Sequence, residues 1–115
     1  MHGKKARMGW QLIRDAHAQR PNWSITNNAF TVLSRMAITA HDKDTSEYDA
    51  RYYFGGWKPL ALSLGYQVEA AELLPPDAKR AVARALRELI DQGLIKPGDD
   101  NQHAGRRHRN YILTY

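Results

Sequence analysis

The feature that most constrains the fold is the segment 77–92, which reads as one amphipathic helix with a signal at each end. Pro75 and Pro76 precede it and Gly93 follows it. Proline is favoured in the first turn of a helix and glycine just after the last turn, so both boundaries are predicted, with Asp77 as the N-cap. Apolar residues at helical spacing predict one buried stripe, and they are Ala78, Val82, Ala85, Leu86, Leu89 and Ile90.

The remaining apolar patterns predict further helices and a small sheet. Thr26 or Asn27 is placed to cap a helix, and Gly65 is placed to end another. The predicted helices cover residues 10–18, 27–40 and 57–64, and the predicted strands cover 51–54, 94–96 and 111–115. The last two strands would form a hairpin with a long tip, and we expect a single domain over residues 9–115 after a basic flexible tail, residues 1–8.

Composition narrows the class of protein. The chain has 115 residues, of which 43% are hydrophobic and 25% charged, as in an ordinary globular domain. The absence of cysteine excludes disulfides, thiolate zinc sites and thiol nucleophiles. No apolar run reaches the roughly 18–20 residues that cross a membrane, and no apolar segment after the basic N-terminus suggests a secretory signal. We therefore expect a cytoplasmic protein with no membrane partner.

Three helices beside a small antiparallel sheet form the winged helix-turn-helix arrangement, which is α+β and mainly α. Leu60–Gly65, read as LALSLG, resembles the L-A-x-x-L-G positioning helix of helix-turn-helix proteins. Val82–Ile95, read as VARALRELIDQGLI, is similar to the end of a recognition helix that runs into a wing. The segments WQLIRDAHAQRP, RYYFGGW and HRNYILTY resemble small winged-helix proteins of actinobacterial phages and the winged-helix modules of phage or plasmid replication initiators.

This resemblance covers about residues 9–115 and implies a three-helix core with a C-terminal wing hairpin. One departure concerns residues 66–76, because a simple helix-turn-helix has a turn of about three to four residues. The longer connection leaves two alternatives open, a changed angle of the second helix or a small extra helix. Val68, Leu73 and Leu74 in this segment would also suit a homodimer contact or a protein partner.

Positive charge gathers at the two ends of the sequence. The net charge is +5, while residues 21–76 hold four basic and six acidic residues. A helix over 77–92 is about 24 Å long, and the DNA major groove is about 12 Å wide, so only the N-terminal half can enter deeply. Arg80, Arg84 and Arg87 follow steps of four and three and share a face, whereas Glu88 and Asp91 come in the last turns.

These charges predict the residues that contact DNA. The helix would enter the major groove, where arginine reads guanine, and its N-terminus would favour a phosphate. The wing, residues 97–110, would contact the backbone or the minor groove. The predicted contacts are Lys79, Arg80, Arg84 and Arg87 on the helix, Arg106, Arg107, His108 and Arg109 at the wing tip, Lys58 at the start of the shorter helix, and Lys4, Lys5 and Arg7 in the tail.

No catalytic motif stands in the sequence. A P-loop, a G-x-G-x-x-G fingerprint and an H-E-x-x-H pattern are all missing. The run Asp42-x-Asp44-x-Ser46 is unlike a calcium loop, because its sixth position is Glu47 and its twelfth is Tyr53. His103 and His108 have no carboxylate pair beside them, and no tyrosine has the metal-binding histidines of a DNA-nicking site. We expect no cofactor, no metal and no enzymatic activity.

The sequence therefore favours a double-stranded DNA-binding protein that acts in phage or plasmid biology, as a transcriptional regulator or at a replication or recombination site. Two alternatives stay open: a winged-helix protein–protein adaptor, and the DNA-binding module of a replication initiator. A single-stranded DNA partner is a minority reading. It would use exposed aromatic side chains beside basic ones, and the only such set is Tyr52, Tyr53 and Trp57 near Arg51 and Lys58.

Overall fold

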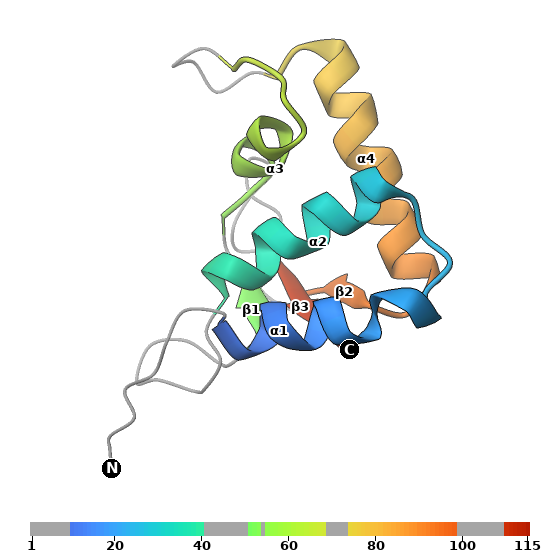
Figure 1. Ribbon diagram of the computed structural model, residues 1–115. Coiled ribbons are helices and arrows are strands. Elements are labelled where there is room, and N and C mark those ends of the chain that lie inside the picture. The colour runs from blue at the N-terminus through green and yellow to red at the C-terminus, as the bar shows by residue number, and fades with distance from the viewer. Residues whose placement is uncertain (1–9, 41–50, 54, 69–73, 99–109) are drawn as a thin grey trace, which may run out of the picture.

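The computed structural model describes residues 10–40, 51–53, 55–68, 74–98 and 110–115. These residues form a mainly helical structure with one small antiparallel sheet, as an α+β fold requires (Figure 1). In chain order the elements are α1 Trp10–Gln19, the 3-10 helix η1 Arg20–Asn22, α2 Asn27–Thr39, β1 Tyr52–Tyr53, α3 Lys58–Ser63, α4 Pro76–Asp91, β2 Ile95–Pro97 and β3 Tyr111–Leu113.

Helix α2 lies at the centre of the helical layer and packs against α1, α3 and α4 (Figure 1). The buried side chains of these helices meet those of the sheet in one continuous core. Its largest fully buried members are Tyr53, Leu33, Met36, Leu60, Leu89, Leu113, Val32 and Val82. The predicted stripe of α4 is buried as expected at every position except Ile90, which is 40% exposed because it lies at the edge of the stripe.

Local signals explain where the helices begin and end. The hydroxyl of Thr26 accepts a hydrogen bond from the backbone N–H of Ala29 at 3.2 Å, so Thr26, and not Asn27, caps α2. Gly65 has φ +96° and follows α3, and Gly93 has φ +76° and follows α4. Both are left-handed conformations that glycine adopts without strain, which confirms the two predicted stops.

The predicted N-cap of α4, Asp77, is wrong by two residues. The helix begins at Pro76 with Pro75 as its cap residue, and Asp77 lies inside the first turn. Proline has the φ that a first helical residue needs, and its missing N–H would have no partner there in any case. Asp77 therefore places a carboxylate at the positive end of the helix and leaves less of that end for a phosphate.

The sheet has the strand order β1-β3-β2, with both pairs antiparallel. Tyr52 pairs with Ile112, and Lys96 pairs with Ile112 from the other side. The predicted hairpin of the last two strands is thus present, and the aromatic run at 52–53 adds a third strand to it. Pro97 lies on the edge strand β2, where a residue without an N–H is tolerated.

No helix in the described part of the chain is both long and apolar enough to span a membrane.

Candidate nucleic-acid interface

The basic side chains predicted on α4 lie together on its solvent-facing side. Lys79, Arg80, Arg84 and Arg87 are all exposed, while the opposite side of the helix faces the core. Helical spacing puts each of them within one turn of another member of the set. The structure thus brings four of the predicted contacts onto one face, and we call this set of four residues the basic face of α4.

One member of the basic face has an acidic partner. The guanidinium of Arg80 lies 2.6 Å from the carboxylate of Asp77, and the two side chains are 72% and 77% exposed. An ion pair so open to water contributes little to stability, so Arg80 can exchange Asp77 for another partner at small cost. Among the residues that the structure describes, Lys79, Arg84 and Arg87 form no ion pair.

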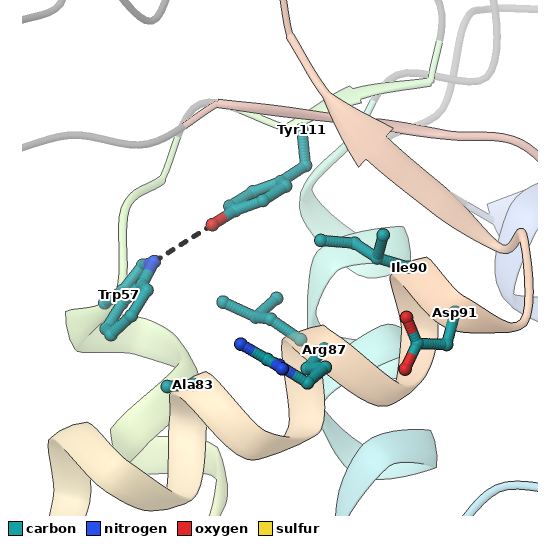
Figure 2. Close-up of a pocket in the computed structure, with 7 residues that line it drawn as sticks. Trp57, Ala83, Arg87, Ile90, Asp91 and Tyr111 are labelled. Carbon is teal, nitrogen blue, oxygen red and sulfur yellow. Dashed lines mark hydrogen bonds between the residues drawn. The ribbon is translucent and has the colours of Figure 1, made fainter.

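A cavity of about 350 Å³ opens beside the basic face (Figure 2). It lies where the start of α3, the C-terminal half of α4 and strand β3 meet. The indole N–H of Trp57 donates a hydrogen bond to the hydroxyl of Tyr111 at 3.3 Å and fixes the two rings at one side of the cavity. Its lining residues are Trp57, Ala83, Leu86, Arg87, Ile90, Asp91 and Tyr111. No pattern in the sequence predicted this cavity, because its walls come from three separate elements.

Lys58 is exposed at the first position of α3, next to Trp57 in sequence. The other predicted contacts lie outside the described residues. They are Lys4, Lys5 and Arg7 of the tail, and Arg106, Arg107, His108 and Arg109 of the predicted wing tip.

The base of the predicted wing is well defined. The backbone N–H of Gly98 donates to the carbonyl of Asn110 at 2.8 Å, and Asn110 is buried. The ring of Tyr52 covers Gly98 so closely that a Cβ there would meet its hydroxyl oxygen. Gly98 and Tyr52 therefore pack together at the end of the sheet, where the Gly98–Asn110 hydrogen bond joins the segments that follow β2 and precede β3.

The single-stranded DNA hypothesis requires exposed aromatic side chains, and that prediction is wrong for Tyr52 and Tyr53. Tyr52 is 8% exposed and Tyr53 is fully buried, because strand β1 packs both against the rest of the molecule. The Tyr53 hydroxyl donates to the carbonyl of Gly56 at 2.8 Å. Burial raises the pKa of Tyr53 above its ordinary range, which makes it a poor nucleophile.

The segment between α3 and α4 is partly described. Val68 and Leu74 are half-buried and pack against the core, and Leu73 lies outside the described residues. Two of the three apolar residues that would suit a docked partner are therefore already in contact with the protein itself.

Within the described ranges, no group of three or more histidine, cysteine, aspartate or glutamate side chains is placed to hold a metal ion. Comparisons with models of protein families, with curated proteins and with solved structures found no match.

Proposed function

We propose that this chain is a winged helix-turn-helix protein that binds double-stranded DNA and has no catalytic activity of its own. Helix α4 would lie in the major groove. The wing over residues 97–110 would contact the backbone or the minor groove. In this proposal α2, α3 and α4 form the three-helix core, β2 and β3 form the stem of the wing, and β1 closes the sheet.

The observation that carries the proposal is the basic face of α4. An ordinary surface helix mixes charges of both signs along its length. Here Lys79, Arg80, Arg84 and Arg87 are exposed on one side. Asp77 is paired to Arg80, and Asp91 lies one turn beyond Arg87 at the C-terminal end of the helix. Glu88 faces away towards α2 and is engaged there by Thr26, so it does not offset this charge locally.

A basic residue at the start of α3 also supports a duplex that lies along α4. Lys58 is exposed there, and its neighbour Trp57 lines the cavity that Arg87 also lines. A duplex held along α4 would therefore meet a cation from a second helix, which would fix its register on the protein through the phosphates. The helix N-terminus is not included as a phosphate site, since Pro76 lacks an N–H and Asp77 supplies a negative charge there.

The biological setting rests on the sequence resemblance alone. It favours a phage or plasmid protein of the cytoplasm that regulates transcription or marks a replication or recombination site, and the DNA-binding module of a replication initiator would use the same face. The adaptor alternative loses ground because Val68 and Leu74 pack against the core.

The test is the affinity of the full chain for a short random-sequence duplex, measured by fluorescence anisotropy from about 50 to 200 mM salt. Each phosphate contact contributes a slope of about −0.9 in log K against log salt. We expect a slope of about −3.6 or steeper, from at least four contacts of this kind. An affinity that does not change with salt, or no binding at about 50 mM salt, would contradict the proposal.

A further inference from the structure

The cavity beside the basic face has an apolar wall at the point where the proposed DNA partner would lie. Ala83 is exposed at the centre of the basic face, three residues after Arg80 and four before Arg87. Figure 2 shows Ala83 and Arg87 on the side of α4 that faces Trp57. Leu86 and Ile90 extend the same wall along the helix, and Ile90 is 40% exposed.

The charges at the cavity favour a base edge over a phosphate. Arg87 supplies one cation, but the carboxylate of Asp91 lies one turn further along and lines the same space. A phosphate seated here would be repelled by Asp91, whereas an uncharged base edge would not. The rings of Trp57 and Tyr111 on the far side are held together by their hydrogen bond and add further apolar surface.

The groups that base pairs present in the major groove then indicate which base edge would occupy the cavity. The C5-methyl group of thymine is the apolar group that a standard base pair presents there, and guanine presents the paired acceptors O6 and N7 that suit arginine. We infer that this wall reads a thymine methyl group next to a guanine, with Ala83 contacting the methyl and Arg87 contacting the guanine. This inference rests on the proposed function and adds a base preference to it.

A duplex with alternating guanine and thymine on one strand provides the probe. Its counterpart has every thymine replaced by uracil, which removes only the methyl groups. Burial of one methyl group is worth about fourfold in an equilibrium constant, so we expect the wild-type chain to bind the thymine duplex about three- to fivefold more tightly.

Ala83→Ser tests the assigned residue, because it puts a polar group at the methyl contact on an exposed helix position. We expect it to reduce the preference for thymine below about twofold. Ala18→Ser is the matched control, since Ala18 is also an exposed helical alanine but lies on α1. This control should keep the wild-type preference, and thermal melting of both variants verifies that they fold.

The guanine half is tested with 7-deazaguanine, which lacks the N7 acceptor. Loss of one of two hydrogen bonds should weaken wild-type binding about three- to tenfold, and Arg87→Ala should bind the normal and modified duplexes equally. Indifference of the wild-type chain to 7-deazaguanine would overturn the role of Arg87.

The outcomes separate this inference from the proposed function. Binding of the thymine and uracil duplexes with equal affinity would overturn the methyl reading and leave DNA binding in place. A preference for thymine that Ala83→Ser retains would overturn the assignment to Ala83. No binding of either duplex at low salt would overturn both the inference and the function on which it rests.

Discussion

The carboxylate of Glu88 on α4 accepts hydrogen bonds from the backbone N–H of Thr26 at 2.9 Å and from its hydroxyl at 3.0 Å. The same hydroxyl accepts a hydrogen bond from the N–H of Ala29 and so caps α2. One acidic side chain therefore connects the last turns of α4 to the first turn of α2. This connection helps to fix the orientation of α4 relative to α2, and the basic face of α4 lies on the side away from the core.

The first prediction concerns that connection. Glu88→Ala should lower the free energy of unfolding by about 1–2 kcal/mol, because it removes charge-assisted hydrogen bonds at a helix cap. Asp91→Ala is the control, since Asp91 is exposed on the same helix and should change stability by less than about 0.5 kcal/mol. Urea unfolding measures both, and equal losses would show that the Thr26 contact contributes nothing.

The second prediction concerns Gly98, at the base of the proposed wing. Gly98→Ala would put a Cβ against the hydroxyl of Tyr52, so the strand or the ring must move. We expect a loss of about 1–3 kcal/mol in the free energy of unfolding, as for other overpacked sites.

The double variant Gly98→Ala/Tyr52→Leu tests the cause of that loss. It should be less destabilised than the sum of the two single variants, because the shorter side chain makes room for the new methyl group. Strict additivity in urea unfolding would show that the ring of Tyr52 is not the obstacle.

The third prediction concerns alkaline pH. Burial raises the pKa of Tyr53 above its value in the unfolded chain, so the folded state keeps a proton that the unfolded state loses. The resulting stability is fully present below the unfolded pKa of about 10 and is lost as the pH rises above it, by up to about 1.4 kcal/mol per pH unit.

Tyr53→Phe should remove this part of the alkaline loss, at a constant cost of about 1 kcal/mol from the missing hydrogen bond to Gly56. Tyr66→Phe is the control and should keep the wild-type slope, because Tyr53 is still present. Urea unfolding between about pH 8 and 11 measures the slopes. A wild-type slope in Tyr53→Phe would contradict the account.

The fourth prediction concerns the ion pair on the basic face. Asp77→Asn removes a negative charge from the first turn of α4 and frees Arg80 from its partner. Because an exposed pair is worth less than about 1 kcal/mol, we expect random-duplex affinity to rise about two- to fivefold with little change in stability. Weaker binding of duplex by this variant would mean that Asp77 positions Arg80 for its contact.

The local parts of this structure could be predicted from the sequence. Thr26, Gly65 and Gly93 act through their own backbone and nearest neighbours, so their effects follow from residue type and position. The stripe of α4 follows from spacing in the same way, and only Ile90 at its edge departs from the pattern. The prediction of Asp77 as the N-cap of α4 is wrong because both Pro76 and Asp77 are residue types that suit the start of a helix.

The contacts between distant segments could not be predicted. Nothing in the spacing joins Glu88 to Thr26, and nothing in the aromatic run at 52–53 says that strand pairing with β3 will bury both tyrosines. The cavity has the same origin, since Trp57, Arg87 and Tyr111 meet only when α3, α4 and β3 are packed together. The basic face itself was predictable because it lies on a single helix.

The central claim is that the basic face of α4 binds duplex DNA, and the salt dependence of Lys79→Ala/Arg84→Ala tests it most directly. Arg14→Ala is the control, because Arg14 is exposed on α1. The double variant should lower the salt slope by about two units, one for each lost contact, while the control keeps the wild-type slope. A double variant that binds random duplex with the wild-type affinity and slope would contradict the claim.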